Sequence, residues 1–184
     1  MRRFAPLAQA LAAAACAVVF MGCAPNPPPR WVEGGAPLVI GAARWDREDE
    51  DSIEITATGE VLEDGDPVFL VDRAGRVVDD DREPVAILLP DGHVAGPDNV
   101  LLGRVGHNNA APPGSAAAWL TILPNGQAVV FDSDGEREAD GVWRGCDGPK
   151  RRTCTLVMHM LRMRYYRDHR GGGVTFGVGV GVGL

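Results

Sequence analysis

The chain has 184 residues, of which 25 are acidic and 18 are basic, so its formal net charge is −7. This acidic balance argues against a nucleic-acid partner, because binding to phosphates needs a basic face. The length suits a single domain with one core once a short N-terminal segment is set aside.

The N-terminal segment has the layout of an export signal. Arg2 and Arg3 precede an uncharged run over residues 4–21 that is rich in alanine and valine, and Gly22 and Cys23 follow it. A basic start, an apolar run and a small residue before the cleavage point are the features of such signals. A plain secretory signal and an uncleaved membrane anchor remain alternatives to the more specific interpretation below.

Residues 20–23, with the sequence Phe-Met-Gly-Cys, make this segment resemble the signal of bacterial lipoproteins. The resemblance implies that residues 1–22 are removed and that Cys23 becomes the lipidated N-terminus, so that the lipid makes the membrane a partner. In that family an aspartate after the cysteine favours the inner membrane. Ala24 at this position therefore implies the outer membrane.

Prolines are dense immediately after Cys23, at Pro25 and at residues 27–29. Proline removes backbone donors and favours an extended polyproline conformation. Residues 23–30 are therefore predicted to be a lipidated cysteine and a stalk, and the folded domain is predicted to span residues 31–170.

A β-rich stretch that runs into a glycine turn occurs four times in the predicted domain. The turn glycines, which are 16, 17 and 34 residues apart, are Gly59, Gly75, Gly92 and Gly126. Such turns between short β-prone runs predict hairpins, and hairpins at this spacing predict an all-β sandwich, meander or barrel. The double interval suggests that a loop around residues 112–114 replaces one unit. Hairpin chemistry alone, without duplication, also explains the likeness.

Two further strands are predicted outside this pattern, at residues 37–40 and 100–105, because both runs are short and apolar. The last stretch, residues 171–184, alternates glycine with valine and other apolar residues. It is interpreted as a strand of the domain's own sheet, a frayed tail, or a strand lent to a partner's sheet edge.

Cysteine usage agrees with export. Cys16 lies in the signal and Cys23 is the lipid site, which leaves Cys146 and Cys154 to form a disulfide in an oxidising compartment. Half of a metal site is the rival interpretation. The two cysteines are predicted to link a hairpin whose tip is residues 147–152, and residues 156–167, which fit both a helix and a strand, are predicted to continue it as a strand.

Two groups of polar residues are the candidate contact surface. His107, Asn108 and Asn109 lie in a loop predicted over residues 106–115, and loops of this length on a β scaffold often carry function. Three adjacent cations at the predicted hairpin tip form the second group, Lys150, Arg151 and Arg152. The alternatives are a plain connector for the first group and a solvated tip for the second.

Catalytic and cofactor motifs are missing from the sequence, so we assign no catalytic residue, no metal ligand and no cofactor. Residues 132–140 open like a calcium loop, but the glycine is misplaced and the closing glutamate is missing; a calcium site between β loops is an alternative. We predict a non-enzymatic lipoprotein that binds an envelope protein or glycan, or has a structural role. The alternative is an exported hydrolase that uses His107 and a nearby carboxylate.

Overall fold

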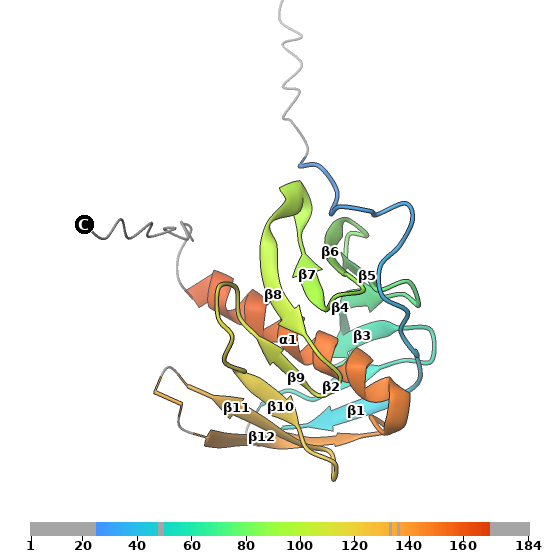
Figure 1. The fold of residues 1–184 in the computed structure, drawn as a ribbon. Helices are drawn as coiled ribbons and strands as arrows, with labels where there is room; N and C mark the ends of the chain where they lie inside the picture. The colour runs from blue at the N-terminus through green and yellow to red at the C-terminus, as the bar shows by residue number, and fades with distance from the viewer. Residues whose placement is uncertain (1–24, 48–49, 133, 136, 170–184) are drawn as a thin grey trace, which may run out of the picture.

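The computed structural model of the chain describes residues 25–47, 50–132, 134–135 and 137–169. The predicted signal, the lipid site Cys23 and the C-terminal stretch 171–184 lie outside these residues. The described part is a closed antiparallel barrel of twelve strands with one long helix, which confirms the all-β, barrel-like prediction (Figure 1).

Every strand of the barrel pairs with its sequence neighbours, and β1 closes the ring between β12 and β2. The strands are β1 (Ala43–Asp46), β2 (Ile53–Ile55), β3 (Glu60–Glu63), β4 (Asp66–Val71), β5 (Arg76–Asp79), β6 (Pro84–Leu88), β7 (His93–Ala95), β8 (Leu101–Val105), β9 (Asn109–Ala111), β10 (Leu120–Ile122), β11 (Gln127–Phe131) and β12 (Arg137–Arg144). We call the end with the β2–β3, β4–β5, β6–β7, β8–β9 and β10–β11 turns the turn end, and the opposite end the loop end.

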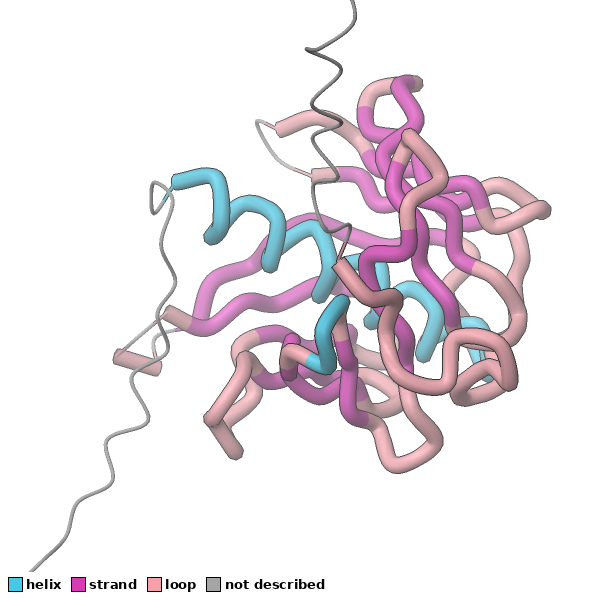
Figure 2. The backbone as a smooth tube through the Cα atoms, turned by 90° about the horizontal axis from the view of Figure 1, so that it is seen from above, coloured by secondary structure: helices cyan, strands magenta, loops and turns pink. Residues whose placement is uncertain are grey.

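The helix α1 (Arg151–His169) lies in the core of the barrel. Residues 153–161 are all buried, although nine consecutive residues cover every side of a helix. Figure 2 shows strands on both sides of α1, and its buried side chains belong to the same apolar cluster as those of the strands. None of the described helices is long and apolar enough to cross a membrane.

The strand predicted over residues 156–167 is therefore wrong, and so is the hairpin predicted around residues 147–152. The chain leaves β12 through a short 3₁₀ turn, η2 (Gly148–Lys150), and enters α1. The segment is rich in Met, Leu and Arg, which favour helix. Its apolar residues show no single face because the barrel surrounds them, so periodicity could not separate helix from strand.

The predicted disulfide between Cys146 and Cys154 is present, with the two Cα atoms 6.1 Å apart. It joins the end of β12 to the first turn of α1 instead of linking two strands. Both cysteines are buried. The disulfide therefore fixes the point at which the helix enters the barrel.

The hairpin turns predicted at the four glycines are confirmed, since each glycine lies in a turn with φ between +75° and +94°. Each also accepts a backbone hydrogen bond from the next hairpin through its carbonyl oxygen. Val71 N–H donates to Gly59 at 2.8 Å, and Trp143 N–H donates to Gly126 at the same distance. A side chain at Gly59 or Gly126 would strike the carbonyl of its donor residue.

The unit predicted to be missing between Gly92 and Gly126 is present as the hairpin β8–β9. Ile122 N–H donates to Asn108 O at 2.7 Å. Asn108 thus accepts the hydrogen bond that a turn glycine accepts in the other four hairpins. The replacement by a loop around residues 112–114 is therefore wrong. Part of the loop predicted over residues 106–115 is β9, whereas the strand predicted over 100–105 is confirmed as β8.

The segment before β1 crosses the turn end of the barrel as an irregular strap, residues 34–42, so the strand predicted at 37–40 is wrong. Ala36 N–H donates to Leu88 O at 2.6 Å, and Leu38 N–H donates to Arg73 O at 3.0 Å. Thr153 of α1 donates its hydroxyl to Val39 O at 3.0 Å. Successive residues thus bond to different elements, which excludes a ladder with any one strand.

The described part of the predicted stalk, residues 25–30, lies against the barrel. Pro28 is buried, and Asn26 is hydrogen-bonded to Asp98 in the β7–β8 connection. The chain is therefore in contact with the folded body from Asn26 onward.

Candidate functional site

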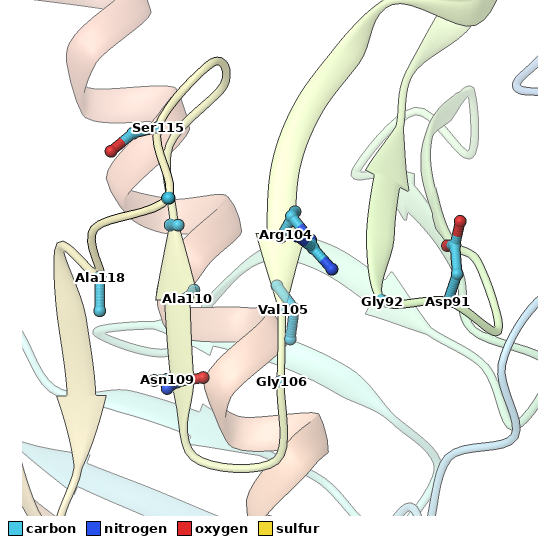
Figure 3. Close-up of a pocket in the computed structure, with 11 residues that line it drawn as sticks. Asp91, Gly92, Arg104, Val105, Gly106, Asn109, Ala110, Ser115 and Ala118 are labelled. Atoms are coloured by element: carbon cyan, nitrogen blue, oxygen red, sulfur yellow. The ribbon is translucent and has the colours of Figure 1, made fainter.

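A pocket of about 250 Å³ lies beside the β8–β9 hairpin. Its walls are the β6–β7 turn, the outer side of β8 and β9, and the loop that joins β9 to β10 (Figure 3). The residues that line it are Asp91, Gly92, Arg104, Val105, Gly106, Asn109, Ala110, Ala111, Ser115, Ala116 and Ala118.

The register of the two strands decides which side chains face the pocket. Arg104 pairs with Ala111, and Val105 pairs with Ala110. Val105 and Ala110 are buried in the apolar cluster of the core, whereas Arg104 and Asn109 are exposed. Because successive side chains of a strand point to opposite faces, the polar pair belongs to the outer surface.

Gly103 lets the barrel wall at β8 approach the helix. A Cβ at this position would lie 2.8 Å from the Cε1 atom of His159 in α1 and 2.4 Å from Ala111 O. Its φ of +121° also belongs to the region that favours glycine. The glycine therefore brings His159 against the inner side of the wall whose outer side forms the pocket.

Arg104 is the strongest binding group in the pocket. Its side chain extends toward the β6–β7 turn (Figure 3), and no hydrogen bond or ion pair of its guanidinium is found among the described residues. A guanidinium presents several donors in a fixed plane and suits carboxylate or phosphate groups. With the Asn109 amide nearby, the pocket can hold a small anionic or polar group.

Asp91 at the edge of the pocket is already engaged. Its carboxylate accepts the backbone N–H of His93 at 3.0 Å and lies 2.9 Å from the Nδ1 atom of the same histidine. The His93 backbone hydrogen bond, followed by the ring hydrogen bond, holds the pKa of Asp91 below its ordinary value. Asp91 therefore stays ionised and gives the rim of the pocket a negative group opposite Arg104.

The pocket does not assemble a nucleophile with a base. Ser115 and Asp91 lie at opposite sides of it (Figure 3). The Ser115 hydroxyl accepts the N–H of Ala117 at 3.0 Å within its own loop. Among the residues described, no three histidine, cysteine, aspartate or glutamate side chains are close enough to hold a metal ion.

The first predicted group, residues 107–109, divides between the pocket and the turn. Asn109 lines the pocket, whereas His107 is exposed in the β8–β9 turn. The backbone oxygen of His107 accepts the Thr155 hydroxyl at 3.2 Å, which ties the turn to α1. No hydrogen bond joins the His107 ring to an aspartate or glutamate in the part of the chain that the structure describes.

The second predicted group, Lys150, Arg151 and Arg152, lies at the start of α1 and not at a free hairpin tip. Arg151 donates to Pro124 O at 3.3 Å and to Cys146 O at 3.4 Å. Lys150 Nζ is 3.6 Å from the Asp147 carboxylate. Lys150 and Arg151 therefore brace the turn end, the end at which His107 also lies, and none of the three cations lines the pocket.

Sequence reasoning missed Arg104, Asp91 and Ser115. Arg104 carried a usable signal, because it is the one charge in the apolar run 100–105 and its neighbour Val105 is apolar. Asp91 and Ser115 carried none, since only the order of the strands in the barrel brings their loops to the same pocket.

His159 is a fully buried histidine in the middle of α1. Its Nε2 atom lies 2.8 Å from Leu102 O, and its Nδ1 atom accepts the indole N–H of Trp119 at 3.2 Å. Burial lowers its pKa to about 4, against a smaller opposing effect of the Leu102 carbonyl. The ring is therefore neutral at physiological pH, with the proton on Nε2.

Comparison of the chain with protein-family models, with curated proteins and with solved structures found no match in any of the three.

Proposed function

We propose that this protein is an exported lipoprotein, anchored in the outer membrane through Cys23, whose barrel is a non-enzymatic binding module for an envelope protein or glycan. The observation that carries the proposal is the pairing of Cys146 with Cys154. Such disulfides form and persist in oxidising compartments, which agrees with the export signal. The lipoprotein-like residues 20–23 supply the anchor.

The barrel supports an external binding surface. Its interior is occupied by α1 and by the inward side chains of the strands, so a ligand meets the outer surface. The pocket beside β8 and β9 offers the Arg104 guanidinium and the Asn109 amide. These groups suit a carboxylate, a phosphate or a hydroxyl-rich glycan, all of which occur in a bacterial envelope.

Labelling cells with radioactive palmitate tests the anchor. We expect the wild-type chain to carry the label and to fractionate with the outer membrane, and the Cys23→Ser variant to lose both properties. A wild-type protein that is unlabelled, or that keeps its N-terminal leader by mass spectrometry, would refute the proposal. Wild type recovered with Cys146 and Cys154 as free thiols would refute the exported state.

Capture from solubilised envelopes tests the binding module. The bait is the lipidated chain, and Arg104→Gln is expected to lose the captured protein or glycan. Arg73→Gln is the matched control, because Arg73 is an exposed arginine in the β4–β5 turn outside the pocket and its replacement changes the net charge equally. Equal capture by both variants would show that the pocket is not the binding surface.

A further inference from the structure

The described chain begins against the tip of the β7–β8 hairpin. Asp98 Oδ1 accepts the backbone N–H of Asn26 at 3.1 Å and its side-chain N–H at 2.9 Å. The Asp98 N–H in turn donates to Asn26 O at 3.0 Å. Three hydrogen bonds thus fix the position of Asn26 on the loop end of the barrel.

This contact limits how far the lipid site can lie from the hairpin tip. Cys23 precedes Asn26 by three residues, and three extended residues span about 10 Å. Figure 1 shows the β7–β8 hairpin rising beside the point where the described chain begins. A lipid attached at Cys23 therefore holds this tip, rather than another part of the barrel, near the bilayer.

The tip is built to present apolar side chains. Asp98 and Asn99 both have positive φ, and Val100 N–H donates to Pro97 O at 3.1 Å, which closes a tight hairpin turn. The two residues that follow are among the exposed large apolar residues, with Val100 49% and Leu101 42% exposed. The turn thus projects two aliphatic side chains beside the attachment point.

We propose that Val100 and Leu101 enter the interfacial region of the same bilayer leaflet that holds the Cys23 lipid, so that the barrel docks on the membrane in one orientation. This inference rests on the proposed lipid anchor. Burial of partly exposed aliphatic side chains is favourable, and the anchor removes most of the cost of bringing them to the membrane.

The charges at the loop end select the kind of leaflet. By sequence, the six connections at this end contain twelve acidic and two basic residues. The acidic ones are Glu48, Asp49, Glu50, Asp51, Asp64, Asp80, Asp81, Glu83, Asp98, Asp132, Asp134 and Glu136, and the basic ones are Arg47 and Arg82. Two arginines of α1 also reach this end: Arg162 donates to Phe131 O at 3.2 Å. Arg164 pairs with Glu63 at 3.4 Å. The balance stays acidic, and anionic headgroups repel such an end, so the expected partner is a leaflet rich in zwitterionic phosphatidylethanolamine.

A fluorophore on the tip tests the docking. Cys23 is lipidated and Cys146 is paired with Cys154, so a cysteine introduced by Val100→Cys is the only reactive thiol of the mature lipidated chain. An environment-sensitive nitrobenzoxadiazole label at this position is expected to shift to the blue in vesicles of phosphatidylethanolamine and phosphatidylcholine. Spin-labelled lipid added to these vesicles is expected to quench it.

Ala57→Cys is the matched control. Ala57 is exposed in the β2–β3 turn at the opposite end of the barrel, so its label is expected to emit as in water. If the label at position 100 also emits as in water while the lipidated protein remains in the vesicles, the docking is wrong and the anchor stands. If the lipid itself is missing, the proposed function fails before the orientation is tested.

Asp98→Gly tests the part played by the Asn26 contact. Glycine keeps the positive φ of the turn but removes the carboxylate that holds Asn26. We expect the blue shift at position 100 to decrease while the protein stays bound to vesicles. An unchanged shift would contradict the role of Asn26 in the orientation. With Asp98 in place, a blue shift at position 100 that increases when phosphatidylglycerol replaces phosphatidylethanolamine at low salt would contradict the preference for a zwitterionic leaflet.

Discussion

His159 is the residue on which the packing of the helix inside the barrel depends most visibly. Its two ring nitrogens bond to different elements, Leu102 O on β8 and the Trp119 indole before β10. Protonation would place a second N–H on the ring, facing the indole N–H of Trp119, and would put a charge in the core. The neutral ring is therefore part of the folded structure.

We expect acid to destabilise the protein through this residue. The folded-state pKa is about 4 and the ordinary value is 6.5, so below pH 6.5 the unfolded chain binds a proton that the folded chain does not. The contribution of His159 to stability is complete above pH 6.5 and is lost progressively as the pH falls from 6.5 to about 4. Between pH 7 and pH 5 the loss amounts to about 2 kcal/mol. Urea unfolding at several pH values measures it.

A comparison of two histidine variants isolates this effect from that of the carboxylates. His159→Gln should lose the dependence between pH 7 and pH 5, and it should be less stable at pH 7 because its amide fits the two partners less well. His107→Gln should keep the full dependence, since His107 is exposed. The same slope in wild type and in both variants would show that His159 does not cause it.

At the scale of elements, the tight hairpin turns determine how neighbouring hairpins meet. Gly59 and Gly65 have nearly equal φ values, +94° and +92°, but different surroundings. A Cβ on Gly59 would lie 2.1 Å from Val71 O, whereas nothing lies within 4 Å of a Cβ on Gly65. The two positions separate the cost of the backbone conformation from the cost of crowding.

We therefore expect Gly65→Ala to lower the free energy of unfolding by about 1 kcal/mol, which is the cost of positive φ for alanine. Gly59→Ala should lower it by about 3 kcal/mol or more, because the turn must also move away from β4 and lose the hydrogen bond from Val71. Chemical denaturation of both variants gives the comparison. Equal losses would show that the close approach to Val71 has no energetic role.

These elements also show what the sequence could and could not predict. The hairpin at Gly59 and the strand at residues 100–105 were predictable because turn chemistry and strand composition are local. The helix was not, since its apolar residues face the barrel in all directions and leave no polar face to mark its period. The strap at 37–40 looked like a strand because local composition does not show whether a pairing partner exists.

The pocket was predictable only in part, for a related reason. Asn109 was identified from its place in a polar stretch, but the pocket also needs Asp91, Arg104 and Ser115. Their association depends on the register between β8 and β9 and on the fold of the β9–β10 loop. Such long-range relations are properties of the closed barrel and not of any one segment.

At the scale of the whole molecule, barrel and helix share one core. The buried residues of α1 belong to the same cluster as Trp45 and Trp143, which stack with ring centroids 5.4 Å apart across β1 and β12. Neither part has an apolar core that is independent of the other. The molecule should therefore unfold as a single cooperative unit.

We expect the loss of helix, followed by far-ultraviolet circular dichroism, and the exposure of tryptophan, followed by fluorescence, to have the same midpoint. Leu156→Ala, which leaves a cavity at a fully buried position, should lower both midpoints together and cost about 3 kcal/mol. Val100→Ala, at an exposed position, should shift neither by a comparable amount. Two separate midpoints in the wild type would contradict a shared core.

The order of the elements along the chain has a consequence for biosynthesis. The helix α1, which fills the barrel, follows all twelve strands in the sequence, and the strap that covers the turn end precedes them. A nascent chain that still lacks residues 151–169 has apolar strand residues without the helix against which they pack, so it cannot form the complete core. Folding is therefore completed only after α1 has been synthesised, and a chain that ends before residue 151 should be a substrate for proteases.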